Sequence, residues 1–229
     1  NAIITIHTAT GTILDDDNLA SLFNEDFETP EGTFPWSVGF PGLQDPDDPD
    51  CVSNPLDPNC DLQLWHIQAL SQCVSPPFNS PSRALVFNDE STCTYDTPGG
   101  VEGFVRLTDG IRIPDVDALS AQLTFSHFLE INLSAVQPEP TTAYVEISNN
   151  GVNGPYETVA TFAPSQPSDD FFVSDWQEVN IPLDQYLGDD IFVQFRFVQP
   201  PESNRHTARG WYIDDLGVEI APRPNGVSK

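Results

Sequence analysis

Residues 191–198 read IFVQFRFV, and the alternation in this stretch decides the fold class. Successive side chains of a β-strand point to opposite faces, so one face of this strand is entirely apolar. That face carries Ile191, Val193, Phe195 and Phe197. The opposite face is mixed and carries Phe192, Gln194, Arg196 and Val198. A strand that is apolar on one face and half apolar on the other is predicted to lie centrally in a sheet.

Short strand-like runs recur on both sides of this stretch, and convincing helical patterns are missing. Residues 121–130 (AQLTFSHFLE) and 143–148 (AYVEIS) alternate in the same way, and the Asn-Asn-Gly that follows the second run is a strong turn signal. Further strands are predicted at residues 34–38, 62–68, 83–87, 158–162, 176–181 and 211–220. Strands at this spacing, with long loops between them, predict an all-β fold: a two-sheet antiparallel sandwich of jelly-roll type.

One domain is predicted over residues 24–221, preceded by an N-terminal strand with an acidic linker (1–23) and followed by a tail (222–229). Residues 2–14 are rich in Ile and Thr, residues 15–18 are Asp-Asp-Asp-Asn, and residues 19–23 are interpreted as one helical turn or a linker. The N-terminal strand either folds back onto an edge of its own sandwich or completes a sheet in a neighbouring subunit. In the second case main-chain hydrogen bonds would hold the subunits together.

The charge balance excludes some partners. The chain has 35 Asp and Glu against 8 Lys and Arg, which gives a formal net charge of -27. It lacks the basic surface that nucleic acid requires, and anionic membrane surfaces are disfavoured for the same reason. No stretch approaches the roughly 20 apolar residues of a membrane-spanning helix. We therefore predict no nucleic-acid partner and no membrane insertion, and either a solvated acidic surface or bound divalent cations.

The cysteines all lie in the predicted loop region 42–94. They are Cys51, Cys60, Cys73 and Cys93. None forms a Cys-x-x-Cys pair, so a zinc site is poorly supported and two disulfides are predicted. Four cysteines allow three connectivities, and pairing between neighbours (Cys51 with Cys60, Cys73 with Cys93) is the one we predict. The disulfides, and the start at Asn1 of a chain without Met, predict a secreted or cell-surface protein that is processed or cut from a longer chain.

A series of strings in a defined order carries a family resemblance. The strings are Phe27-Glu28 with Gly32, Pro35 and Trp36, then Leu64-Trp65-His66, SRALVF, Tyr95-Asp96-Thr97, LTFSHFLE, AYVEISNNG, a Trp176 strand leading to IPLDQYLG, IFVQFRF and GWYIDD. Over about residues 23–220 the chain resembles a widespread bacterial family of MAM-like, lectin-like jelly-roll modules found in secreted peptidases and cell-surface proteins. That resemblance implies a fold and no reaction. The chain departs from the pattern in its proline-rich, cysteine-bearing loop and its N-terminal strand, so no particular ligand is implied.

The closing motif GWYIDDLGV, at residues 210–218, carries the most chemistry. If Trp211 and Ile213 point into the core, Asp214 points outward, and Asp215 returns inward unless a β-bulge intervenes. An inward carboxylate is costly to bury unless a cation or hydrogen-bond donors satisfy it.

The resemblance gives these carboxylates a role. In modules that this sequence resembles, the terminal acidic pair and the glutamate of the first strand lie beside a structural calcium. Position by position, this implies a Ca²⁺ site at Glu28, Asp214 and Asp215, which Asp26 and loop carbonyls complete. The alternative is that Asp214 and Asp215 end a strand and accept backbone hydrogen bonds, while Asp26 and Glu28 are solvated.

No pattern in the chain indicates catalysis. Gly-x-Ser-x-Gly, His-Glu-x-x-His and phosphate-loop motifs are missing, and His66 and His127 are interpreted as packed or hydrogen-bonded. Aromatic side chains that could hold a sugar are Trp36, Trp65, Trp176 and Tyr212, although burial is favoured for each, and for Trp211. The sequence predicts a non-catalytic, calcium-stabilised extracellular module for adhesion or for binding protein or carbohydrate. The alternative is a self-assembling fibre subunit that uses its N-terminal strand.

Overall fold

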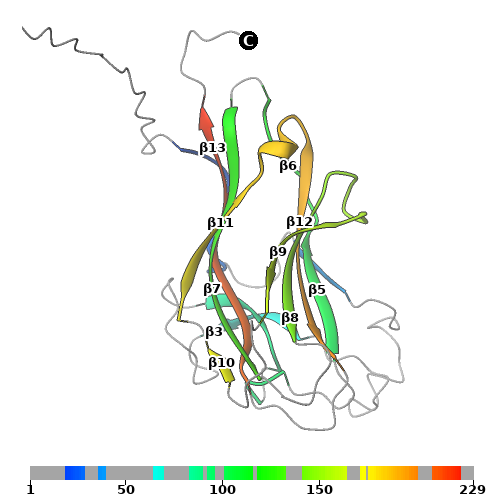
Figure 1. The fold of residues 1–229 in the computed structure, drawn as a ribbon, viewed down its shortest axis with the longest axis vertical. Helices are drawn as coiled ribbons and strands as arrows, with labels where there is room; N and C mark the ends of the chain where they lie inside the picture. The colour runs from blue at the N-terminus through cyan, green and yellow to red at the C-terminus, as the bar shows by residue number, and fades with distance from the viewer. Residues whose placement is uncertain are drawn as a thin grey trace, which may run out of the picture.

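Two antiparallel β-sheets pack face to face in the computed structural model of the protein (Figure 1). The structure describes residues 19–28, 36–39, 64–69, 83–89, 92–95, 101–115, 118–132, 141–163, 171–173, 175–200 and 208–222. These residues form thirteen strands and one short 3₁₀ helix, η2 (Asp184–Tyr186). The predicted fold class, an all-β antiparallel sandwich of jelly-roll type, is therefore confirmed.

The first sheet, sheet A, has β7 and β13 at its centre. Its order is β10 (Phe171–Val173), β7 (Ala118–Asn132), β13 (Gly210–Pro222), β4 (Arg83–Phe87) and β3 (Trp65–Ala69). Two further strands pair with the central ones: β1 (Ala20–Glu25) with β13, and β11 (Gln177–Pro182) with β7. In Figure 1 these strands form one layer of the molecule.

The second sheet, sheet B, has β12 at its centre. Its order is β2 (Trp36–Gly39), β5 (Val101–Leu107), β12 (Asp190–Gln199), β8 (Thr142–Ser148) and β9 (Glu157–Phe162), and β6 (Ile111–Arg112) also pairs with β12. The stretch IFVQFRFV is thus a central strand with partners on both sides, as predicted.

The core fills the space between the sheets with aromatic side chains. The ring of Phe195 lies 5.5 Å from that of Trp211 and 6.1 Å from that of Trp36, and Phe197 stacks on Phe87 at 4.5 Å. Trp211 is fully buried, as the alternation of β13 predicts. Aromatic pairs in such tilted and offset arrangements stabilise by about 0.5–1.5 kcal/mol each beyond the area that they bury.

The structure corrects the interpretation of residues 19–23. A helical turn or linker was predicted, but residues 20–25 form β1, which pairs with β13 from Ala20 opposite Ile220 to Glu25 opposite Leu216. The predicted domain boundary at residue 24 therefore falls inside a strand. Besides β1, three strands were not predicted: β5, whose alternation is broken by Gly103, and the very short β6 and β10.

Other predictions fall largely outside the described residues. Cys93 is disulfide-bonded, but Cys51, Cys60 and Cys73 are not among the described residues, so the pairing stays a prediction. The same holds for the strand at residues 2–14 and its acidic linker. No helix among the described residues is long and apolar enough to cross a bilayer.

Candidate functional site

The outward face of sheet B carries a row of polar side chains, one from each of five neighbouring strands. The register pairs Ser37 with Arg106, Arg106 with Gln194, Gln194 with Glu146, and Glu146 with Thr158. We call these five residues the polar row. Side chains that share a row of a sheet lie about 5 Å apart, so the row is continuous. Two of its members, Gln194 and Glu146, are only 5% and 6% exposed, and the other three carry most of its accessible surface.

Charged hydrogen bonds tie this row to its neighbours. Gln194 Nε2 donates to Glu146 Oε2 at 2.6 Å. The Arg196 guanidinium donates to Glu146 Oε1 from two nitrogens, at 2.7 and 3.0 Å, and to Glu102 Oε1 at 3.0 Å. Burial lowers the pKa of Arg196, but bonds and charges from Glu146 and Glu102 outweigh it and leave the pKa raised. The guanidinium is therefore a fixed cation held in one orientation.

Aromatic rings stand beside the charged groups. Phe104 and Tyr144 lie directly opposite Arg196 on the two flanking strands, and the Arg196 guanidinium sits 4.2 Å from the centre of the Tyr144 ring. The Arg106 guanidinium lies 3.9 Å from the Phe104 ring centre and 5.2 Å from that of Tyr156. Such cation–π contacts are worth about 0.5–1 kcal/mol at exposed sites and more when desolvated.

The turn between β8 and β9 holds one of these rings in place. The Tyr156 hydroxyl and Arg106 both donate to the carbonyl oxygen of Val152, at 2.8 and 3.0 Å. Burial and the charge of Glu146 raise the pKa of Tyr156 against the opposing charge of Arg106, so the hydroxyl stays a donor. We call the polar row, together with Glu102, Phe104, Tyr144, Tyr156 and Arg196, the sheet B face.

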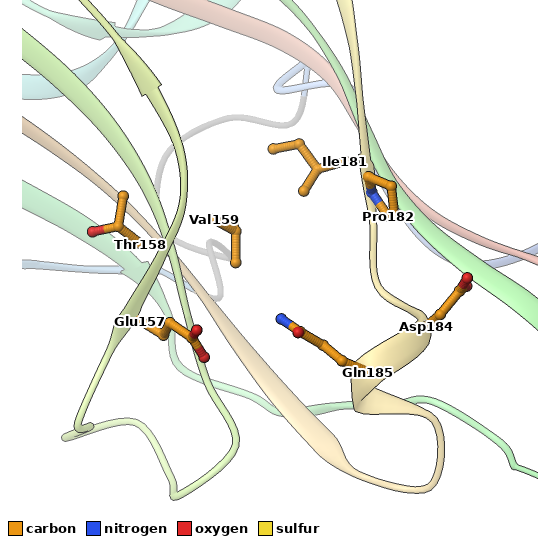
Figure 2. Close-up of a pocket in the computed structure, with 7 residues that line it drawn as sticks. All are labelled: Glu157, Thr158, Val159, Ile181, Pro182, Asp184 and Gln185. Atoms are coloured by element: carbon orange, nitrogen blue, oxygen red, sulfur yellow. The ribbon is translucent and has the colours of Figure 1, made fainter.

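A hollow lies between strands β9 and β11, at the facing edges of the two sheets. We call it the edge cleft; its volume is about 500 Å³, and it is lined by Glu157, Thr158, Val159, Ile181, Pro182, Asp184 and Gln185. Figure 2 shows Val159 of β9 and Ile181 of β11 directed into the space between the strands, with Glu157 and Gln185 at its rim. Asp184 Oδ1 accepts a hydrogen bond from the Ala121 N–H at 3.0 Å, which fixes the start of η2 beside the cleft.

A β-bulge interrupts the closing motif, so Asp215 does not return to the inward face. Asp214 pairs with Ser126 and Gly217 with Thr124, so two residues of β13 face one of β7. Asp215 occupies the bulge with φ 51° and is exposed, whereas Asp214 is fully buried. Asp214 Oδ1 accepts a hydrogen bond from the Asp215 N–H at 2.9 Å.

The other predicted calcium ligands lie at the end of β1. Asp26 Oδ1 accepts from the Glu28 N–H at 3.1 Å, and Glu28 Oε1 accepts from the Arg83 N–H at 3.0 Å. Burial, and then the nearby charge of Asp26, raise the pKa of Asp215. The structure thus brings Asp26 close to Asp215, but it gathers no three metal-ligating side chains among the described residues.

The aromatic residues singled out from the sequence are mostly buried. Trp65 and Tyr212 are fully buried, Trp36 is 8% exposed and Trp176 is half-buried. The rings of the sheet B face were missed. Tyr144 could have been found, because the alternation in AYVEIS places it on the face opposite Val145. Phe104 could not, because β5 itself was not predicted.

His66 and His127 were interpreted as packed or hydrogen-bonded, and the structure agrees. Trp211 Nε1 donates to His127 Nδ1 at 3.1 Å, and the His127 ring packs 4.5 Å from that of Phe162. Burial lowers the pKa of His127 to about 4. His66 Nδ1 lies 3.1 Å from the Leu64 carbonyl oxygen.

Comparisons with known proteins give distant likenesses. No family model and no curated protein matches the chain. The K1 cleaved adhesin domain of Lys-gingipain from Porphyromonas gingivalis W83 is 14% identical with a TM-score of 0.47, over 88% of this chain and 98% of that chain. CBM27-1 of Caldicellulosiruptor saccharolyticus, in complex with mannohexaose, is 13% identical with a TM-score of 0.43, over 90% and 98% of the two chains. Values this low identify no family, and the resemblance to MAM-like modules stays a prediction.

Proposed function

We propose that the protein is a non-catalytic extracellular module that binds carbohydrate on the sheet B face. The observation that carries this proposal is the juxtaposition, across five strands, of the polar row with the half-buried rings of Phe104, Tyr144 and Tyr156. A sugar ring presents apolar C–H groups on its faces and hydroxyl groups around its rim. Aromatic rings pack against the first, while guanidinium donors and carboxylate or amide acceptors bind the second.

The preorganisation of this face favours binding. Arg196 is fixed by two carboxylates and one ring, and Arg106 by the Val152 carbonyl and two rings. Side chains that are already held in place lose little conformational entropy when a ligand arrives. The His127 ring is buried in the core and its Nδ1 accepts a hydrogen bond from the Trp211 indole, so it is not placed to act as a base on an external substrate. This supports a module that binds without catalysis, for which a protein partner is the second candidate ligand.

Replacing Tyr144 by Ala is expected to weaken binding of an oligosaccharide about 10- to 100-fold, because a hot-spot ring contributes roughly 1–3 kcal/mol. The probes are the β-1,4-linked hexaoses of glucose, xylose, mannose and galactose, and the measurement is isothermal titration calorimetry on the full chain. The control is Leu119→Ala, which removes an exposed side chain of β7 on the other sheet and should leave affinity unchanged. Equal affinities for Tyr144→Ala and the parent chain would place the ligand elsewhere. A folded protein that binds none of the four probes, nor any glycan on an array, would count against carbohydrate binding altogether.

We also propose that a bound calcium ion stabilises sheet A where β1 pairs with β13. Asp214 is fully buried with one oxygen on a backbone N–H, and Gln68 is fully buried while neither of its side-chain polar atoms has a partner. Gln68 of β3 pairs with Ala84 of β4, and the β4–β13 pairing ends with Leu85 opposite Ile213, so extending this register by one residue sets Asp214 beside Ala84. An orphaned amide oxygen and a buried carboxylate, with only a small side chain between them, fit a hard cation. Burial and the nearby charge of Asp26 raise the pKa of Asp215, and calcium bound here would offset the repulsion between these two carboxylates.

Chelation is the test of the calcium proposal. Saturating calcium at about 1,000 times its dissociation constant should stabilise the fold by about 4 kcal/mol, which raises the melting temperature by roughly 10 °C relative to excess chelator. Asp214→Asn should abolish this difference. The matched control is Asp190→Asn, whose side chain is 61% exposed and which should retain it. Identical melting curves of the parent chain in calcium and in chelator would refute a structural ion.

A further inference from the structure

One side of the sandwich is open between β9 and β11. On the opposite side β1 of sheet A approaches β6 of sheet B. On this side, among the described residues, β9 pairs only with β8 and β11 only with β7, so each presents an unpaired backbone edge. Between these edges lies the edge cleft, with Val159 and Ile181 directed into it (Figure 2). Unpaired edges beside an apolar opening invite the addition of a strand.

The chain contains a segment whose chemistry suits this opening. Residues 2–14 (AIITIHTATGTIL) include four Ile and four Thr, and all 35 Asp and Glu of the protein lie after them. Such a β-branched, carboxylate-free segment has a high strand propensity and, if exposed, would be an aggregation hazard. The rim of the cleft carries Glu157 and Asp184, and the segment brings no charge that these carboxylates would repel.

The start of β1 lies within reach of the cleft. Ala20 lies opposite Ile220, Ile220 lies opposite Ala121, and the Leu183 N–H donates to the Ala121 carbonyl, so one row runs from the start of β1 to the end of β11. Three strand spacings are about 14 Å, and the five residues 15–19 can span about 16 Å.

The chain direction of such a segment would allow it to pair antiparallel with β9. Phe162 of β9 contacts His127, which pairs with Gln177 at the start of β11, while Glu157 accepts a hydrogen bond from Tyr186 of η2. Strand β9 therefore runs away from the row that ends at Leu183. A segment that lies in the cleft and then leads into β1 runs toward that row, antiparallel to β9. The β-bulge at Val159 turns that side chain toward the core and leaves residues 160–162 as the regular edge for pairing.

We propose that residues 2–14 of the same chain dock in the edge cleft, pair antiparallel with β9 and insert Ile side chains between the two sheets. Docking within one chain is favoured over docking on a neighbour because the short linker keeps the segment at a high effective concentration beside the cleft. Docking of residues 2–14 beside β9 is independent of any glycan bound on the sheet B face.

Hydrogen exchange of the full chain and of a chain lacking residues 1–14 tests the proposal. Outward amides of β9 should exchange at least about 10-fold more slowly in the full chain, whereas amides of the central strand β12 should be equally protected in both and report that the shorter chain is folded. Adding a synthetic peptide of residues 1–14 to the shorter chain should restore the protection. Equal exchange of β9 in both chains overturns the proposal.

Two further experiments cover the case in which the shorter chain does not fold and the case in which the segment docks on a neighbouring copy. If the shorter chain does not fold, the full chain with Ile4→Asn and Ile6→Asn replaces it, with Thr8→Ser and Thr10→Ser as the matched control that should keep β9 protected. Light scattering should show a monomer for the full chain. An oligomer that dissociates to monomers when residues 1–14 are removed would assign the segment to a neighbouring copy, which overturns docking within one chain and supports a fibre subunit.

Discussion

Replacing Gly210 by Ala is expected to cost at least about 4 kcal/mol of folding free energy, which is a large part of the roughly 5–15 kcal/mol that stabilises a typical domain. Gly210 begins β13 with φ 93°, and a Cβ there would overlap the carbonyl oxygen of Phe87 on β4. Backbone cannot rotate away as a side chain can, so relief requires separating β13 from β4 where Trp211 pairs with Phe87. Guanidinium chloride unfolding followed by tryptophan fluorescence measures the effect.

Gly151→Ala is the matched control. Gly151 has a similar φ of 98°, but a Cβ there would meet no atom within 4 Å. Only the cost of the left-handed conformation remains, roughly 1–2 kcal/mol. The difference between the two variants therefore isolates the close contact of β13 with β4. Similar losses in both would show that the two strands are not as close as the structure places them.

Acid is expected to destabilise the protein through His127, by roughly 3 kcal/mol between about pH 7 and about pH 4. Burial lowers the pKa of this histidine from 6.5 to about 4 in the folded state. Above 6.5 both folded and unfolded chains carry a neutral ring, so His127 adds no pH dependence there. As the pH falls from 6.5 toward 4, the unfolded chain binds a proton that the folded chain does not, and stability is lost.

The comparison with His127→Gln separates this effect from others. Burial raises the pKa of both Glu25 and Asp215, and their titration acts in the opposite direction, stabilising the fold as the pH falls. Those carboxyls are present in both proteins, so the difference between the two denaturation series reports His127 alone. Glutamine keeps an acceptor for the Trp211 indole N–H and does not titrate. Parallel stability curves for the two proteins across this pH range would contradict the prediction.

The sequence places several residues of the sheet B face on outward positions of their strands. It does not show which of these strands lie side by side, and therefore which residues form the site together. The alternation in IFVQFRFV and AYVEIS assigns Gln194, Arg196, Tyr144 and Glu146 to outward positions. That Glu102 lies within 3.0 Å of Arg196 depends on the pairing of β5 with β12, and these two residues are 94 positions apart. Nothing in the local pattern of either strand specifies the other as its partner.

By itself, the sequence determined which residues alternate, and therefore most strands, their inward faces and the burial of Trp65 and Trp211. The physical reason is that side-chain alternation is a local property of the backbone. Only the tertiary structure decided that residues 20–25 form a strand, that a bulge turns Asp215 outward, and that five strands assemble the sheet B face. Each of these depends on hydrogen bonds between residues far apart in the chain, whose register is set by packing across the whole sandwich.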